Sequence, residues 1–537
     1  MIRFVVPILL VAAAILMGLL LPANPWVIWL LAPVVVLLGV AAWDLLQTKH
    51  TLRRNYPVIA HIRWFFEDLR PYLRSYIVES DLDGRPFNHN DRALVYARAK
   101  DDNSSHPFGT ELNVYSEEYD WLNHSIVPNE RAAEEFRVNV GGPQCKKPYS
   151  AAILNISAMS FGSLGAKAIE TLNLGAQQGG FYHDTGEGGF SPYHAKHGGD
   201  IVWEIGSGYF GCRTDDGDFD PEKFAQTATL DQIKMIEIKL SQGAKPGHGG
   251  MLPGAKVTAE IAATRHIPIG KDCVSPAAHT AFTTPLEMLD FVQQLRTLSG
   301  GKPVGIKLCV GQPHEVFAVM KAMLQSGIKL DFIVVDGGEG GTGAAPVELS
   351  DRVGMPLREG LILVNNALIG AGLRGDVRIA ASGRVISGAS LAMNAALGAD
   401  WSNAARGFMF SLGCVQSLQC HTGKCPTGIA TQSASRQRGL VVEDKAERVS
   451  RFQKQTAAAL RDIVVSMGLD TPSQIRPHHL HERLNAVKSS SIDQIYPFLK
   501  ANALIDTPEA TPYARFWAAA QAESFRALAD IPQTSYE

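Results

Sequence analysis

The chain has 537 residues, of which 46% are hydrophobic and 19% are charged, with 50 glycines and 29 prolines. This length excludes a small disulfide-stapled module and allows one large catalytic domain with additional segments. The 50 Lys and Arg residues balance 53 Asp and Glu residues, so the formal charge of −3 gives no electrostatic basis for nucleic-acid binding. Apolar residues gather at the start of the chain and glycines in a few loops, which indicates an enzyme with a membrane segment.

Two apolar runs at the N-terminus, residues 5–21 and 26–43, are each about as long as the ~17–25 residues that cross a bilayer core. Arg3 precedes the first run and Lys49 follows the second, so the positive-inside rule places both ends in the cytoplasm. We therefore expect residues 1–50 to form a transmembrane hairpin in the inner (cytoplasmic) membrane, with the catalytic domain facing the cytoplasm. A cleaved signal peptide and a buried core hairpin are the alternatives.

Two further segments flank the expected catalytic domain. Residues 51–144 predict a linker with a helical cover segment, because apolar residues recur at near-helical spacing over 59–78. Such a stripe suits a helix on the membrane surface or a helix packed against the catalytic domain. Residues 436–537 predict a helical C-terminal region packed on that domain, with helical spacing over 440–467 and 516–529.

Between residues 145 and 435, short apolar or β-branched runs alternate with loops and helical stretches, as in parallel sheets. Eight units over roughly 260 residues predict a TIM (β/α)8 barrel, an α/β fold that typically spans ~250 residues. A Rossmann-type sheet is the alternative, but no G-x-G-x-x-G follows a strand and opens a helix. The expected strands are 151–157, 180–184, 201–205, 235–240, 303–309, 330–336, 377–382 and 400–405, and the clearest helices are 166–178, 285–298, 315–326 and 387–397.

Glycine-rich loops follow these strands, at the end of a barrel where chemistry takes place. They read MSFGS at 159–163, TGEGG at 185–189, QGAKPGHGG at 242–250 and GGEGGTG at 337–343. Such glycines let backbone N–H groups approach a planar or anionic ligand, although any single loop also fits an ordinary tight turn. Because SGR at 382–384 and ARG at 405–407 occupy the usual phosphate position of a barrel, we expect a phosphate-bearing cofactor in its mouth.

Three of the seven cysteines, Cys414, Cys420 and Cys425, lie close together in a glycine-containing loop. In an enzyme that faces the cytoplasm, clustered thiols bind a metal or take part in catalysis more often than they form disulfides. Zinc with His421 as a fourth ligand is one alternative, and plain structural thiols are another. Three cysteines without an obvious fourth fit a three-iron cluster better.

Taken in order, these motifs resemble the FMN-binding synthase domain of the glutamate synthase family over about residues 145–435. The anchors are the loops above together with EIKLSQGAKPG at 237–247, LPG at 252–254 and CPTGIATQ at 425–432. The resemblance implies a TIM barrel that binds FMN and carries a 3Fe–4S cluster on Cys414, Cys420 and Cys425. It also implies reductive amination, in which ammonia condenses with 2-oxoglutarate and reduced FMN delivers hydride to the imine carbon.

The resemblance also implies roles for single residues. Lys307 resembles the family's lysine near the flavin N1–O2 edge, where a cation stabilises the anionic reduced flavin. Glu187 and Lys245 are the expected catalytic residues, with Glu187 handling protons or orienting ammonia. The expected substrate-binding residues are Lys245, Arg265, Gln242 and Ser160, and the other cofactor-binding residues are Met159, Ser160, Gly162, Asp336, Gly338, Ser382, Gly383, Arg384, Arg406 and Gly407.

The chain also departs from the family. Full glutamate synthases carry an N-terminal glutamine amidotransferase and a C-terminal β-helix, and the chain resembles neither. We therefore expect ammonia or another amine to come from a separate amidotransferase or other chain, and electrons to come from a ferredoxin or a membrane redox protein. The alternatives are the same cofactors acting on another amine, such as an N-alkyl glutamate, and a non-catalytic electron-transfer subunit.

Overall fold

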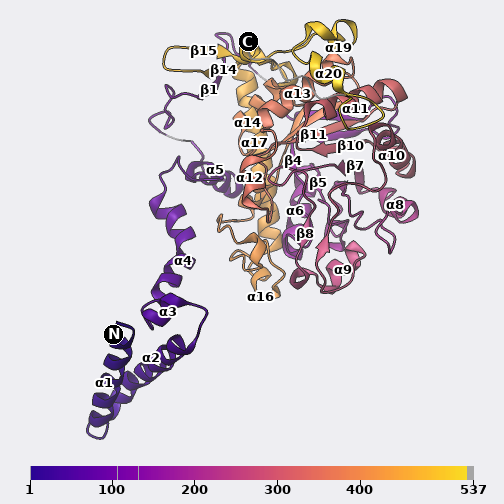
Figure 1. The fold of residues 1–537 in the computed structure, drawn as a ribbon. Helices are drawn as coiled ribbons and strands as arrows, with labels where there is room; N and C mark the ends of the chain where they lie inside the picture. The colour runs from indigo at the N-terminus through magenta and orange to yellow at the C-terminus, as the bar shows by residue number, and fades with distance from the viewer. Residues whose placement is uncertain (1, 106, 131, 529–537) are drawn as a thin grey trace. The chain divides into compact units, whose positions relative to one another are not determined.

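A computed structural model describes residues 2–105, 107–130 and 132–528 of the chain (Figure 1). The chain divides into two compact units, Met1–His89 and Asn90–Glu537. The larger unit contains all the strands and the expected catalytic residues, and the smaller unit contains the apolar runs of the N-terminus.

The larger unit is built on a closed barrel of eight parallel strands (Figure 1), which closes where β13 (Trp401–Ala404) pairs with β4 (Leu154–Ile156). Each of the eight predicted strands corresponds to one barrel strand, so the predicted TIM-barrel fold is confirmed and the Rossmann-type sheet is excluded. In chain order the strands are β4 (Leu154–Ile156), β5 (His183–Asp184), β6 (Ile201–Ile205), β7 (Ile233–Lys239), β10 (Val304–Leu308), β11 (Phe332–Asp336), β12 (Arg378–Ser382) and β13 (Trp401–Ala404).

Helices connect these strands and cover the outside of the barrel. Their ends follow local rules: α10 begins with Pro285 and a capping box of Thr284 and Glu287, and α11 ends at Gly327 in the left-handed conformation. The long α17 packs along α6 and α14. The helices are α6 (Ala166–Gly179), α7 (Pro192–Ala195), α8 (Pro221–Ala228), α9 (Ala259–Arg265), α10 (Pro285–Leu298), α11 (Pro313–Ser326), α12 (Val347–Arg352), α13 (Leu357–Gly370), α14 (Gly388–Ala396), α15 (Arg406–Ser411), α16 (Ala434–Gln437) and α17 (Val442–Ser466).

The first predicted strand, 151–157, differs in the structure because it is two strands. β3 (Tyr149–Ala152) pairs antiparallel with β2 (Arg137–Val140) outside the barrel, and only β4 joins the barrel. The side chain of Asn155 turns back and donates a hydrogen bond of 2.7 Å to the carbonyl of Ala152. This local bond occupies a carbonyl at the end of β3 and separates the two pairings.

The C-terminal region is helical only in part. The helix α17 confirms the first predicted helix, whereas β14 (Leu480–Arg483) and β15 (Ser489–Ser491) form a three-stranded sheet with β1 (Asp120–Leu122). Arg358 bridges Asp120 on β1 and Glu482 on β14, which explains why this sheet forms against α13. The helices after β15 are short: α18 (Ile492–Ile495), α19 (Ala503–Asp506) and α20 (Ala514–Ala519). Of the predicted helix at 516–529, only residues 516–519 are helical among those that the structure describes, and residue 529 lies outside the described residues.

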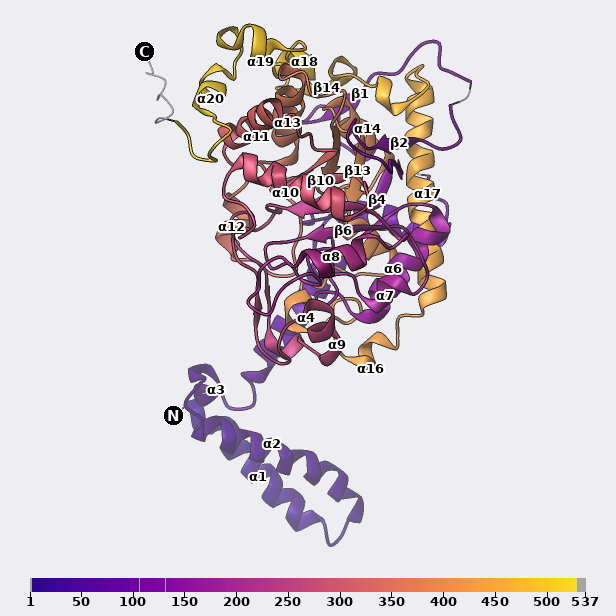
Figure 2. The ribbon, with the colours of Figure 1, turned by 90° about the vertical axis from the view of Figure 1, so that its right-hand side faces the viewer.

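In the smaller unit, α1 (Val5–Leu20) and α2 (Ile28–Leu46) pack side by side as a hairpin (Figures 1 and 2). The stretch Pro25–Leu46 is long and apolar enough to cross a membrane, and Val5–Leu20 is a shorter apolar helix. Most large apolar side chains of this hairpin are exposed, with Trp29 at 80%. The hairpin is followed by α3 (Thr51–Asn55) and α4 (His61–Leu73), while α5 (His89–Lys100) leads into the larger unit.

Candidate active site

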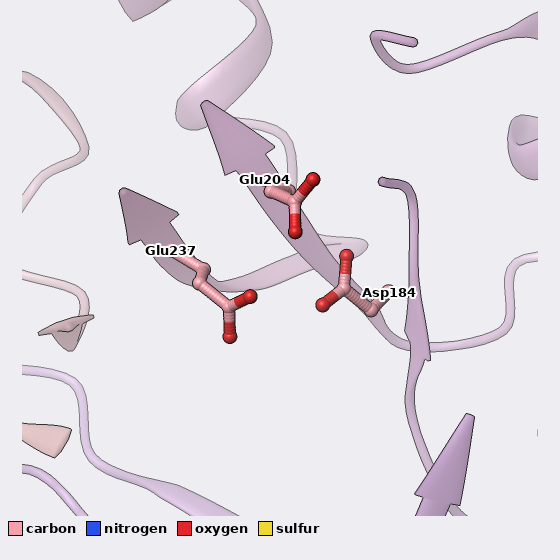
Figure 3. Close-up of side chains that lie close together, drawn as sticks. All are labelled: Asp184, Glu204 and Glu237. Atoms are coloured by element: carbon pink, nitrogen blue, oxygen red, sulfur yellow. The ribbon is translucent and has the colours of Figure 1, made fainter. Parts of the chain in front are cut away.

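Three buried carboxylates face one another inside the barrel (Figure 3), and a buried lysine lies beside them. Lys307 on β10 places its Nζ 2.7 Å from Glu204 Oε2 on β6 and 3.9 Å from Glu237 Oε1 on β7. Asp184 at the end of β5 completes the group, because oxygens of Asp184, Glu204 and Glu237 all lie within 4.8 Å of one another. Side chains alternate along a strand, so single charged residues in these apolar strands point into the barrel.

Charge and burial act against each other in this group. Burial opposes the charge of Lys307, but Glu204, Glu237 and Asp184 together hold its pKa well above its usual range, so Lys307 is ionised. Burial and the neighbouring carboxylates raise the pKa of Asp184 and of Glu237. The three oxygens have the spacing of a cation site, and the ammonium of Lys307 supplies the positive charge there.

A second charged group surrounds Glu187 in the loop after β5. Its Oε2 lies 3.1 Å from Nζ of Lys239, the last residue of β7. Burial raises the pKa of Glu187, but the charges of Lys239, Arg265 and Lys245 outweigh burial and lower it to about 2. Glu187 is therefore an ionised hydrogen-bond acceptor at neutral pH, and three cations surround this single carboxylate. The excess positive charge suits an anionic substrate.

Arg265 at the end of α9 holds two of the glycine-rich loops together. Its Nη2 donates to the carbonyl of Phe161 at 3.0 Å, and its guanidinium lies over the ring of Phe210. A Cβ added at Gly162 or at Gly188 would come within 3.2 Å of the same Nη2. The glycines of the loops after β4 and β5 therefore make room for this buried guanidinium.

The backbone of the loop after β7 lies in direct contact with the backbone of the loop after β11. The N–H of Gly243 donates to Asp336 Oδ2 at 2.9 Å, and a Cβ at Gly243 would lie 2.0 Å from the carbonyl of Gly337. Ala244 N–H donates to the carbonyl of Gly338. Half-buried Gln242 precedes this contact directly, so glycine at 243 is what brings Gln242 and Lys245 to the barrel mouth.

The loops after β11, β12 and β13 also converge. Asp336 and Ser382 pair in register on neighbouring strands, and both residues are buried. Arg406 donates to the carbonyl of Glu339 at 2.8 Å. Burial, together with the nearby charge of Arg384, lowers the pKa of Arg406 to about 10. Two guanidinium groups that repel each other at this end of a barrel fit a bound phosphate group.

The three cysteines of the triplet lie in a loop after α15 that is held from several sides. Tyr96 of α5 donates to the carbonyl of Cys414, and Lys256 Nζ donates to the carbonyl of Cys420 at 2.8 Å. Backbone N–H groups near Thr427 help to lower the pKa of Cys425, although burial opposes this. The negative charges of Cys420 and Cys425 help burial to raise the pKa of Cys414 to about 12.

The same loop carries left-handed backbone at two residues other than glycine, Gln416 (φ 50°) and Leu418 (φ 58°). Such strain persists only where surrounding contacts impose it, and it gathers at functional sites. Three thiols on a constrained loop, facing backbone donors and one lysine, fit a metal–sulfur centre. Gln432 links this loop to the first glycine-rich loop, since its Nε2 donates to the carbonyls of Gly162 and Leu164.

The structure thus distributes the predicted site residues over four groups: Lys307 inside the barrel, the residues around Glu187, the residues at the ends of β11, β12 and β13, and the cysteine triplet. Ser160 is half-buried in the loop after β4, beside buried Met159 and Gly162. Sequence reasoning gave no role to Lys239, Asp184, Glu204 and Glu237. Their signal was present, because each is a charged residue in or directly after an apolar run that forms a barrel strand. Of the remaining predicted residues, Ser382 ends β12, half-buried Gly383 and exposed Arg384 follow it, and Arg406 and buried Gly407 begin α15.

Residues 129–470 match the family described as a conserved region in glutamate synthase. The chain is 36% identical over 506 residues to the glutamate synthase large subunit-like protein YerD of Bacillus subtilis (strain 168), covering 86% of this chain and 95% of that protein. It is 33% identical over 321 residues to an archaeal-type glutamate synthase (NADPH) of Thermotoga neapolitana. It is 34% identical over 322 residues to the archaeal glutamate synthase (NADPH) of Archaeoglobus fulgidus. Each of these two matches covers 60% of this chain and 60% of the relative. Among solved structures, a mutant flavocytochrome b2 with pyruvate bound matches 77% of this chain and 91% of its own, with a TM-score of 0.41 at 12% identity.

The low pKa of Glu187 predicts how stability depends on pH. Because the folded pKa of about 2 lies below the ordinary value of 4.5, ionised Glu187 stabilises the fold fully above about pH 4.5 and less as pH falls toward 2. Glu187→Gln is expected to lower the free energy of unfolding at pH 7 by roughly 3 kcal/mol. Urea unfolding at pH 7 and pH 4 measures the difference, which should shrink at the lower pH.

The exposed Glu348 provides the matched control for this experiment. Glu348→Gln is expected to change the free energy of unfolding by less than about 0.5 kcal/mol at both pH values. An effect of Glu187→Gln that equals this control, or that grows as pH falls, would contradict the charge cluster around Glu187.

Proposed function

The chain belongs to the glutamate synthase family of oxidoreductases, and from that premise we propose that it carries out FMN-dependent reductive amination of a 2-oxo acid. The substrates proposed are 2-oxoglutarate and ammonia, and the product is glutamate. The observation that carries the proposal is the excess of cations around Glu187 at the barrel mouth. Lys239, Lys245 and Arg265 outnumber the one carboxylate that they surround, as binding a dicarboxylate requires.

Within this proposal the cations and Glu187 have different tasks. Lys245 is 9% exposed and would bind a substrate carboxylate as a point charge. Arg265 already hydrogen-bonds the carbonyl of Phe161, so it adds positive charge while it fixes the loop geometry. Glu187 is ionised and would accept hydrogen bonds from ammonia or from the imine nitrogen, which orients the carbon that is reduced. Bound FMN would supply the hydride.

The barrel residues fit the proposed FMN. Arg384 and Arg406 would hold its phosphate, with Ser382 and Gly383 at the same strand ends. Met159 and Ser160 would line the ring from the loop after β4. Lys307 pairs in register with Lys239, so the proposed flavin-binding cation lies on the strand next to one of the cations around Glu187. A cation at that position would stabilise a reduced flavin.

We also propose that Cys414, Cys420 and Cys425 ligate a 3Fe–4S cluster through which electrons enter. The bonds from Gln432 to Gly162 and Leu164 support a short route, because they join the cysteine loop to the loop proposed to line the flavin. The donor would be a ferredoxin or a membrane redox protein. Two of the relatives are named for NADPH, but no G-x-G-x-x-G follows a strand and opens a helix in this sequence. A separate amidotransferase would supply ammonia.

The N-terminal hairpin is proposed to anchor the protein in the inner (cytoplasmic) membrane. Its large apolar side chains are mostly exposed, which in water would be costly and in lipid is favourable. The basic residues on either side of the hairpin favour a catalytic domain that faces the cytoplasm.

The reaction is tested with the protein purified in detergent under anaerobic conditions and reduced. Adding 2-oxoglutarate and ammonium is expected to reoxidise the flavin with formation of glutamate, measured by absorbance and by mass spectrometry. Replacing ammonium with an alkylamine distinguishes an N-alkyl glutamate as the product. Protein that contains flavin but is not reoxidised by any 2-oxo acid and amine would contradict the reaction.

In the same assay, Lys245→Gln should raise KM for 2-oxoglutarate about 10- to 100-fold, because a charge-assisted hydrogen bond contributes about 1.5–3 kcal/mol. Lys271, an exposed lysine of the same segment, provides the control. Lys271→Gln should leave KM unchanged, and an equal effect of both variants would show that the loss is not specific to Lys245.

The cluster proposal predicts that Cys420→Ser lowers the iron content and removes the electron paramagnetic resonance signal of the oxidised cluster. Cys145→Ser, at a half-buried cysteine outside the triplet, should leave both unchanged. Full iron content in Cys420→Ser would overturn the ligation by this triplet.

The anchor proposal predicts that the full chain sediments with membranes, resists a high-salt wash and is released by detergent. Added protease should digest the barrel in inverted vesicles and spare it in right-side-out vesicles. Release by salt alone would contradict a spanning hairpin, and digestion in right-side-out vesicles would contradict the orientation.

A further inference from the structure

One layer of side chains inside the barrel, formed by Asp184, Glu204, Glu237 and Lys307, contains more acidic than basic groups. Asp184, Glu204 and Glu237 face one another from β5, β6 and β7 (Figure 3), and Lys307 forms ion pairs with Glu204 and Glu237. If all four groups were ionised, this layer would have a charge of −2 while each side chain is at most 4% exposed. Like charges at such separations in a buried site are strongly unfavourable, and one proton relieves the repulsion.

We propose that Asp184 and Glu237 share one proton and, with Glu204, act as positioning residues that hold Lys307 at the floor of the cofactor site. The shared proton is a property of the chain alone. Its effect on a bound flavin rests on the proposed function.

Three contacts distinguish the members of the group. Glu204 Oε2 lies 2.7 Å from Lys307 Nζ and forms the direct ion pair, whereas Glu237 Oε1 lies 3.9 Å away. Asp184 Oδ1 accepts a hydrogen bond of 2.9 Å from the N–H of Gly186, which favours its ionised form. Among the described residues, Glu237 Oε1 is buried without any hydrogen-bond partner.

These contacts locate the proton on Glu237. A buried carboxylate without donors is costly, whereas a carboxylic acid needs one acceptor, and an oxygen of Asp184 lies within 4.8 Å of an oxygen of Glu237. Glu237 then donates to Asp184, Asp184 keeps its backbone donor, and Glu204 keeps the ion pair with Lys307.

Two more titratable groups face this layer. Burial, together with the charges of Glu237 and Asp184, raises the pKa of Tyr182 so far that its phenol stays neutral. Asp336 on β11 interacts with Lys307, and burial raises its pKa, while it accepts the N–H of Gly243. Neither group supplies a positive charge, so Lys307 is the only cation among the described groups that balance the layer.

The proposal predicts different effects on the flavin potential for two isosteric substitutions, Glu237→Gln and Glu204→Gln. Glu237→Gln replaces a neutral acid with a neutral amide and leaves the charge of the layer at −1. Glu204→Gln removes one negative charge next to Lys307. If the flavin lies above Lys307, Glu204→Gln should shift its reduction potential to more positive values, because the anionic reduced form gains stability, and Glu237→Gln should leave the potential close to that of the native protein.

Infrared spectroscopy tests the proton directly, with or without flavin. At pH 7 the native protein should show the carbonyl band of a protonated carboxylic acid that Glu237→Gln removes and Glu204→Gln retains. If Glu237→Gln removes no protonated-acid band, the proposal of a shared proton is overturned. An equal rise in reduction potential in both variants would also overturn it. A protein that shows the band and holds no flavin would contradict the proposed function and leave the shared proton standing.

A labelled protein keeps the test valid if Glu237→Gln does not fold. Carboxyl-13C-labelled glutamate is incorporated into Glu315→Gln, a variant that removes another glutamate whose pKa burial raises. The protonated-acid band should move to lower frequency with the label. A spectrum at pH 7 without any label-sensitive protonated band would overturn the proposal.

Discussion

Closure of the barrel through the pairing of β13 with β4 is the constraint on which the candidate site depends. Parallel strands that close into a ring place all their carboxyl ends at one mouth. Residues as distant in sequence as Ser160, Lys245 and Arg406 thereby belong to loops on the same rim. The glycines of these loops allow backbones to touch, as at Gly243 and Gly337, and an ordinary side chain there would separate the loops.

Charge is distributed unevenly along the barrel axis. In the interior, three carboxylates surround Lys307, while at the mouth three cations surround Glu187. Each minority charge is held ionised by its surroundings, since the pKa of Lys307 is raised and that of Glu187 is lowered. The positive charge at the mouth therefore attracts anions, and the carboxylates of the interior hold the ammonium of Lys307 in place. This arrangement fits the proposed binding of an anionic substrate next to a flavin.

The sequence allowed the barrel, and the strand ends that hold the candidate site residues, to be predicted because both rest on local patterns. Apolar runs followed by glycine-rich loops mark strand ends, and these are where Glu187, Lys245 and Ser382 lie. Two features depend on distant partners and were not predictable. β14 forms a sheet with β1 across more than 350 residues, and Arg358 joins both strands from α13. The split of the first strand also depends on its partners, because β3 pairs with β2 outside the barrel and β4 pairs with β13 within it.

The sequence by itself determined the fold class, the family and the clustered thiols of Cys414, Cys420 and Cys425, because order and spacing along the chain carry that information. Only the tertiary structure decided which charges meet. Glu204 and Lys307 are 103 residues apart in the chain and 2.7 Å apart in the barrel. Lys239, absent from the predicted site, forms the shortest ion pair of Glu187 that the described residues show. Protonation follows from such contacts, because burial and neighbouring charge set a pKa, and neither is readable until strands from different parts of the chain lie side by side.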